Sequence, residues 1–146
     1  MQIVIGSDHA AFEAKEFVKE LLCSMSFEVI DVGTNSSDRC DYPDFASALA
    51  KVVQEKKIQG ILLCGSGIGV SIVANRYKGI RAALCRNPLD AEMAKKHNDA
   101  NVLCLGARTN SKEELKLIID SWFKAQFEGG RHGDRLKKFE NLGERF

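Results

Sequence analysis

Short apolar runs alternate with longer helix-compatible segments along the whole chain, and this alternation constrains the fold more than any other feature. Segments of about 10–15 residues, with apolar positions at helical spacing, separate the runs. Strands alternating with helices of this length are typical of a parallel sheet covered on both faces. We therefore expect an α/β fold, a doubly wound three-layer α/β/α sandwich with a five-stranded, Rossmann-like parallel sheet. The predicted strands are Gln2–Gly6, Phe27–Val32, Ile61–Cys64, Gly79–Cys85 and Asn101–Leu105.

Several predicted helices carry local start or stop signals. Asn87 before Pro88 suits an N-cap followed by proline in the first turn, Pro43 suits the same first-turn position, and Ser111 with Glu114 forms a capping box. After Gly129-Gly130 the tail is polar, with a weak helical pattern. We see no repeat or linker, so residues 1–146 are predicted to form a single domain. The predicted helices are Phe12–Met25, Tyr42–Lys56, the segment after Gly69 to Tyr77, Pro88–Lys96 and Leu115–Phe127.

The composition limits the classes of partner. The 146 residues, 45% of them hydrophobic, suit one globular domain with a sizeable core. The net charge of +1 creates no overall field that would recruit nucleic acid or an anionic membrane, so we expect neither partner. No apolar run approaches the roughly 20 residues of a membrane span. The opening MQIVIGSDHAAF lacks the basic and long apolar regions of a signal peptide and is expected to form the first strand.

The cysteines show no paired spacing. Their number is odd and no two form a C-x-x-C motif, unlike zinc sites and disulfide frameworks. We therefore expect reduced thiols in a cytoplasmic protein. Cys85 and Cys104 end apolar runs and are expected to be small core residues. The five cysteines are Cys23, Cys40, Cys64, Cys85 and Cys104.

A glycine-rich turn follows the third predicted strand and leads into a helix. Its sequence is Gly65-Ser66-Gly67-Ile68-Gly69, and Cys64 stands directly before it. Backbone N–H groups that converge at such a turn suit an anion, and they favour a thiolate that could act as base or nucleophile. A dinucleotide fingerprint normally follows the first strand and a P-loop needs Gly-Lys-Ser/Thr, so neither matches. An oxyanion or phosphate cradle and a tight packing turn both remain open, and a lone cysteine is more often a buried spectator.

Other polar residues gather near the strand ends. Ligands of doubly wound sheets bind beyond the carboxyl ends of the strands, and this rule collects further candidates. They are Asp8 and His9 after the first strand, Arg108 after the fifth, His97 and Asn98 just before the fifth, and Arg131, His132 and Arg135 in the tail.

Each of these candidates also has a structural explanation. Asp8 could be a helix N-cap, His97 a cation at a helix C-terminus, and the arginines a solvated surface. The spacing of Arg131 and Arg135 would place both on one helix face, which suits a phosphate. Together the residues offer an acid, a base, an oxyanion cradle and a phosphate clamp, with no grouped metal ligands. This inventory suits proton transfer beside the carbonyl of a phosphorylated small molecule.

A set of short motifs follows in order along nearly the whole chain: Gly6-Ser7-Asp8-His9, Asp41-Tyr42-Pro43, Cys64–Gly69, Ala74-Asn75-Arg76, Gly79-Ile80-Arg81, His97-Asn98-Asp99, Gly106-Ala107-Arg108 and Glu128-Gly129-Gly130-Arg131-His132. This set resembles the ribose-5-phosphate isomerase B family, which belongs to a wider group with the galactose-6-phosphate isomerase subunits. The resemblance implies an aldose–ketose isomerase that interconverts ribose 5-phosphate and ribulose 5-phosphate in the pentose phosphate pathway, through an enediolate and without metal or cofactor.

The same resemblance assigns residue roles. Cys64 would be the base that moves the proton between C1 and C2, and His97 the acid that opens the sugar ring, with help from Asp8. Ser66, where relatives often have Thr, would shuttle protons between O1 and O2. The enediolate would be held by the backbone of Gly65, Ser66, Gly67, Ile68 and Gly69, the sugar by Asp8, His9, Tyr42 and Asn98, and the phosphate by His9, Arg108, Arg131 and Arg135.

The resemblance further implies a site shared between subunits of a homodimer or a dimer of dimers, with residues 128–146 as an arm that reaches the partner. Some relatives lack the cysteine and carry a glutamate six positions later. Here that position is Val70, which cannot take a proton, so Cys64 is the expected base. The alternatives are isomerisation of allose 6-phosphate or galactose 6-phosphate, a non-catalytic module that binds a sugar phosphate or nucleotide, and a thiol enzyme with Cys64 as nucleophile.

Overall fold

A computed structural model of the chain describes residues 1–144, and a five-stranded parallel sheet forms its centre. The strand order is β2-β1-β3-β5-β4, and every neighbouring pair is parallel. The predicted sheet is confirmed; residues 145 and 146 of the predicted domain and arm lie outside the described part. The strands are β1 (Gln2–Ser7), β2 (Glu28–Asp31), β3 (Gln59–Cys64), β4 (Ala82–Leu84) and β5 (Val102–Gly106).

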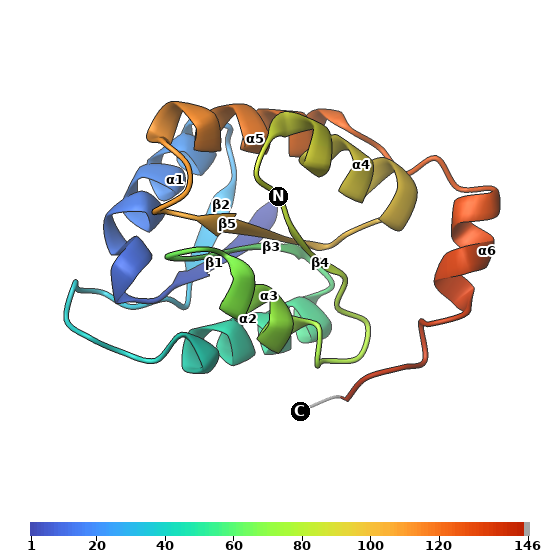
Figure 1. Cartoon of the computed structure of the whole chain (residues 1–146), viewed down its shortest axis with the longest axis horizontal. Helices are drawn as coiled ribbons and strands as arrows, with labels where there is room; N and C mark the ends of the chain where they lie inside the picture. The colour runs from blue at the N-terminus through green and yellow to red at the C-terminus, as the bar shows by residue number, and fades with distance from the viewer. Residues whose placement is uncertain (145–146) are drawn as a thin grey trace.

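Helices cover both faces of this sheet, which confirms the three-layer sandwich. One face carries α1 (Phe12–Ser24), α4 (Pro88–Asn98) and α5 (Lys112–Lys124), and the other carries α2 (Tyr42–Lys56) and α3 (Ile68–Ala74) (Figure 1). A short 3-10 turn, η1 (His9–Ala11), follows β1. Helix α6 (Arg131–Lys137) stands apart from these layers, beside the C-terminal end of α4.

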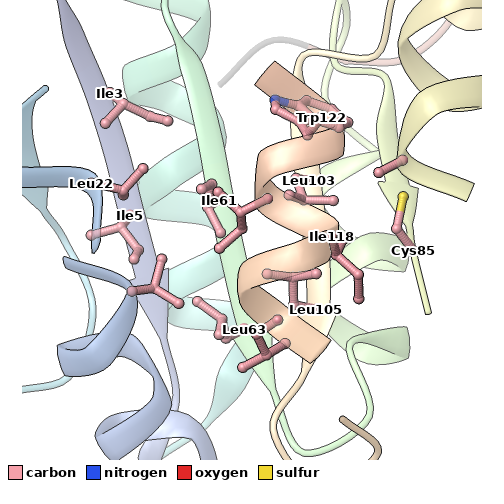
Figure 2. Packing of buried hydrophobic residues seen from close by; sticks show 14 of the residues in the cluster. Ile3, Ile5, Leu22, Ile61, Leu63, Cys85, Leu103, Leu105, Ile118 and Trp122 are labelled. Atoms are coloured by element: carbon pink, nitrogen blue, oxygen red, sulfur yellow. The ribbon is translucent and has the colours of Figure 1, made fainter. Parts of the chain in front are cut away.

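The strands are apolar on both faces because helices bury both. Alternate side chains of β1, β3 and β5 point toward α5, where Ile61 and Leu103 lie near Ile118 and Trp122 (Figure 2). The intervening residues form a second cluster with α2 and α3. Cys85 and Cys104 are buried as predicted, and burial raises the pKa of the Cys85 thiol to about 12. These two thiols are core residues.

The predicted helix signals are present. Pro43 lies in the first turn of α2, and Asn87 Oδ1 accepts the Asp90 N–H at 2.8 Å at the start of α4. Ser111 and Glu114 form both bonds of a capping box, with the Glu114 N–H donating to Ser111 Oγ at 3.2 Å and the Ser111 N–H donating to Glu114 Oε1 at 2.8 Å.

Several element boundaries differ from the predictions by one to three residues. Strand β4 begins at Ala82 instead of Gly79, because the backbone before Ala82 forms hydrogen bonds with the Asn101 side chain instead of with a neighbouring strand. Its Nδ2 donates to Gly79 O at 2.8 Å and its Oδ1 accepts the Arg81 N–H at 2.8 Å. Helix α4 continues two residues past Lys96, and α5 ends at Lys124 instead of Phe127.

The segment after α6 forms backbone hydrogen bonds with the loop after α3 in the same chain. The Glu144 N–H donates to Arg76 O at 3.0 Å, and Glu144 forms a parallel bridge with Tyr77. Within residues 1–144, none of the helices combines the length and apolar character required to cross a membrane.

Candidate active site

Cys64 is the last residue of β3, and its thiol lies against the glycine turn. The side chain is buried, and the Gly67 N–H donates to its Sγ at 3.1 Å. Gly67 has a φ of +78°, and a Cβ there would lie 2.7 Å from Leu84 Cδ1 and 2.9 Å from the backbone of Leu105. Glycine is thus required both by the backbone conformation and by the close approach of β5. The turn therefore holds the Gly67 N–H at a tightly fixed position beside the thiol.

Side chains of two other segments lie against this turn, and one side chain of the turn itself bonds to its backbone. Ser66 Oγ accepts the Ile68 N–H at 3.2 Å. A Cβ on Gly69 would lie 2.7 Å from the Tyr42 ring, and one on Gly65 would lie 3.3 Å from Arg108 Cδ and Nη1. The predicted cradle, Tyr42 and Arg108 therefore come together around Cys64. Val70 is fully buried on α3, in an apolar setting.

Asp8 and His9 follow β1, which pairs with β3 up to Ser7 and Leu63. Asp8 is buried, and its Oδ1 accepts the Ala11 N–H at 3.3 Å as the cap of η1. His9 Nδ1 lies 3.2 Å from both the backbone N and the backbone O of Cys40. This arrangement leaves Nε2 as the ring nitrogen for a ligand. Sequence reasoning missed Cys40 as the partner, because nothing in its spacing links the 33–41 loop to His9.

His97 and Asn98 lie at the opposite edge of the sheet. Lys95, two residues before His97, donates from Nζ to Gln59 Oε1 at 3.0 Å, and Gln59 is the first residue of β3. Cys64 is the last residue of this six-residue strand, so the two ends are about 16 Å apart. The expectation that one sheet edge collects all the candidates is therefore wrong within one chain. A helix that follows a parallel strand returns to the amino edge before the next strand begins.

His97 belongs to a cluster with two residues from the tail. Its ring stacks on that of His132, with centroids 4.3 Å apart and planes 15° apart. Glu128 Oε1 lies 3.7 Å from His97 Nε2 and 3.6 Å from His132 Nε2. Sequence reasoning did not find this cluster. The i, i+4 spacing of Glu128 and His132 was a usable signal, but Gly129-Gly130 between them obscures it.

The electrostatics of the cluster distinguish its two imidazoles. Partial burial lowers the pKa of His132, and the neighbouring His97, Arg131 and Arg135 lower it further, while Glu128 acts in the opposite direction. The three potential ligand atoms lie within 4.8 Å of one another, a spacing open to a metal ion. However, the two rings are stacked, so their in-plane lone pairs lie in two separate, nearly parallel planes and do not meet at one ion. The geometry suits proton exchange better than metal binding.

Arg131 and Arg135 lie on α6 as the i, i+4 pair that the sequence predicts, and both are exposed. A cavity of about 670 Å³ opens beside this helix, with Asn98, Arg81 and Leu136 in its lining. Asn98 therefore faces a hollow at the amino edge of the sheet, whereas Cys64 and its glycines lie at the carboxyl edge.

The family model described as Ribose/Galactose Isomerase matches residues 3–139. The chain belongs to the ribose/galactose isomerase family. Ribose-5-phosphate isomerase B of Escherichia coli is 43% identical over 145 residues, which cover 99% of this chain and 97% of that protein. A probable ribose-5-phosphate isomerase B of Mycoplasma pneumoniae is 46% identical over 138 residues, covering 93% and 91% respectively. The predicted family resemblance is confirmed.

Solved structures of ribose/galactose isomerases have the same fold. Ribose-5-phosphate isomerase B from Clostridium thermocellum superposes with a TM-score of 0.94 at 44% identity, covering 96% of this chain and 95% of that one. The Mycoplasma genitalium enzyme, solved with bound ribulose-5-phosphate, has a TM-score of 0.91 at 42% identity, covering 95% and 93%. In this member of the family, one edge of the sheet carries Cys64 with its cradle, and the other carries the histidine cluster.

Proposed function

We propose that the protein is an aldose–ketose isomerase that interconverts ribose 5-phosphate and ribulose 5-phosphate, a step of the pentose phosphate pathway. The observation that carries the proposal is the Cys64 thiol against the backbone N–H of Gly67, in a chain that matches ribose-5-phosphate isomerases B along nearly its full length. One such relative was solved with bound ribulose-5-phosphate. The unpaired cysteines further favour a reducing, cytoplasmic location.

Cys64 acts as the base on the open-chain sugar. Its thiolate removes the proton from C2 of the aldose and returns it to C1, and negative charge develops on the oxygens between these steps. Preorganised N–H donors of the Gly65–Gly69 turn stabilise that enediolate by about 3–4 kcal/mol per donor, the magnitude typical of oxyanion holes. Ser66, whose Oγ lies in the turn, moves the proton between O1 and O2. No metal is needed for this sequence of steps.

His97 acts as the acid that opens the ring, and this role requires a second subunit. The ring oxygen is bonded to C1, so the acid and the base must reach neighbouring atoms of the same sugar. In one chain Cys64 lies at the carboxyl end of β3 and His97 near the amino end, where Lys95 bonds to Gln59, and these two ends of the strand are about 16 Å apart. In a homodimer, both groups reach the same sugar because His97 and Asn98 of one subunit lie opposite Cys64 and Asp8 of its partner. Ile68 and Ile72, 44% and 60% exposed on α3, offer an apolar contact surface beside the cradle.

Basic side chains, not the cradle backbone, bind the phosphate. His9 and Arg108 lie at the Cys64 edge, and Arg131 and Arg135 on α6 come from the partner through the arm that begins at residue 128. Guanidinium groups suit this role because they bind phosphate oxygens in pairs. Tyr42, against Gly69, closes the side of the pocket.

The test is a direct isomerase assay on ribose 5-phosphate with EDTA present, beside allose 6-phosphate and galactose 6-phosphate. We expect turnover of the pentose phosphate to persist in EDTA and to exceed that of both six-carbon sugars. Cys64→Ala should reduce turnover at least about 100-fold and retain ligand binding, whereas Cys23→Ala, which removes an exposed thiol, should behave like wild type. Near-normal activity of Cys64→Ala would rule out the thiol as base, and faster six-carbon turnover would reassign the substrate.

A further inference from the structure

We propose that Glu128 and His132 are positioning residues that hold the His97 ring in place for ring opening. The inference rests on the proposed function, because it assumes that His97 is the ring-opening acid. It starts from the juxtaposition of the Glu128 carboxylate, 3.7 Å from His97 Nε2, with the His132 ring stacked at 4.3 Å.

A backbone hydrogen bond holds this cluster close to α4. The Glu128 N–H donates to Lys96 O at 3.0 Å, which anchors the segment to the last turn of the helix that carries His97. Gly129 and Gly130 then take φ values of +70° and +56° and reverse the chain. Helix α6 begins directly after them, and His132 in its first turn stacks on the His97 ring. Such φ values favour glycine, so the double glycine serves to fold His132 onto His97.

The charged groups around the cluster come from both α4 and α6. Arg131 and Arg135 of α6 are cations that oppose a positive charge on His132, and Lys96 of α4 lies in the field of Glu128. Two stacked imidazoles also repel when both are protonated. Because burial and these neighbours lower the pKa of His132, that ring stays neutral and serves as a flat support. The Glu128 carboxylate lies 3.7 Å from His97 Nε2 and 3.6 Å from His132 Nε2, so it holds the two stacked rings together and orients His97, as the third group beside a catalytic base does.

The experiment separates ring opening from enediolate chemistry. Ribose 5-phosphate is cyclic in solution, whereas ribulose 5-phosphate stays open-chain because its 5-hydroxyl is esterified. Deuterium exchange at C1 of ribulose 5-phosphate in D₂O therefore requires the cradle and its base but no ring opening. In Glu128→Gln we expect kcat for ribose 5-phosphate to fall roughly tenfold, with the exchange rate unchanged. Glu92→Gln, which removes a carboxylate from the Lys96 pair on the same helix, is the control and should change neither rate.

His132 is tested by keeping or removing its flat ring. His132→Phe preserves the stack and should retain nearly wild-type kcat, whereas His132→Ala should lower kcat for the cyclic substrate and leave the exchange rate unchanged. In a His97→Asn background, Glu128→Gln should have no further effect, because a positioning residue acts only through the group it positions. Circular dichroism verifies the fold of each variant.

The unfavourable outcomes are distinct. Equal losses of isomerisation and exchange in Glu128→Gln, no loss of either, or additive losses in the double variant would each overturn the positioning role. A His132→Ala variant with raised KM and normal kcat would make His132 a substrate-binding residue instead. If wild type exchanges no deuterium into ribulose 5-phosphate, the proposed function itself fails, whatever the variants do.

Discussion

A fully buried lysine, Lys15, shows how a single ion-paired residue contributes to the stability of the fold. Its Nζ donates to Asp31 at 2.5 Å and to Glu16 at 3.1 Å, and Asp31 also accepts the Gly33 N–H at 2.9 Å. We expect Asp31→Asn to lower the free energy of unfolding by about 2–4 kcal/mol, because it leaves a buried ammonium poorly compensated. Urea denaturation measures this loss. Asp120→Asn, in an exposed helix pair with Lys116, is the matched control and should change stability by less than about 0.5 kcal/mol.

The pH dependence of the Asp31 contribution follows from its pKa. Burial alone would raise that pKa, but hydrogen bonds from Lys15, Lys19 and the Gly33 N–H outweigh burial and hold it below its ordinary value of 3.8. A carboxyl with a lowered folded-state pKa contributes stability above its unfolded pKa and loses it as pH falls through the folded value. The stabilities of wild type and Asp31→Asn should therefore converge below about pH 4. Curves that stay parallel down to pH 2 would contradict this reasoning.

Residue partners are the part of the site that the sequence does not predict. The apolar runs predict which residues lie at the strand ends, such as Asp8, Cys64 and Arg108. The contact of His9 with the Cys40 backbone depends on how the 33–41 loop folds, and loops carry no periodicity. The same holds for Glu128, which meets His97 only because two glycines reverse the chain.

At the scale of elements, the sequence predicts nearly the whole arrangement. Alternation of apolar runs with helical segments predicts the parallel sheet, and the caps at Asn87 and Ser111 predict where two helices begin. The predicted start of β4 is wrong for a local reason. The backbone of Gly79 and Arg81 forms hydrogen bonds with the Asn101 side chain instead of with a neighbouring strand. Side-chain bonds of this kind cannot be read from hydrophobic periodicity.

The junction of β3 and α3 is the element we expect to tolerate change least. Gly67 and Gly79 have nearly the same φ, +78° and +81°, but a Cβ at Gly67 would clash with Leu84 and Leu105, whereas one at Gly79 would meet none of residues 1–144 within 4 Å. Gly79→Ala should cost about 1 kcal/mol of backbone strain. Gly67→Ala should cost roughly 1–3 kcal/mol more through overpacking and also abolish turnover, because it shifts the N–H groups beside Cys64. Urea denaturation and the isomerase assay check both variants; equal losses of stability would contradict the packing argument.

At the scale of the molecule, topology decides what one chain can do. Residues that follow a parallel strand lie at the carboxyl edge, and residues that precede one lie at the amino edge. His97 and Asn98 precede β5, so the rule that gathers Cys64, Asp8 and Arg108 places them at the other edge. That separation could have been predicted from the sequence, whereas the arrangement of a second chain could not, because the surfaces that meet are not periodic.

Subunit mixing tests whether two chains share each site. Cys64→Ala chains keep His97 and His97→Asn chains keep Cys64, so a mixed dimer with a shared site has one intact site and one doubly altered site. Random mixing of equal amounts makes half the dimers mixed, and we expect about a quarter of wild-type turnover of ribose 5-phosphate, far above either parent variant. The two variants are co-refolded from urea and assayed beside each variant refolded separately. If each site lay within one chain, no mixed dimer would regain an intact site and the mixture would show only the average of its parents. Recovery of activity would therefore require Cys64 of one subunit and His97 of the other to act on the same sugar.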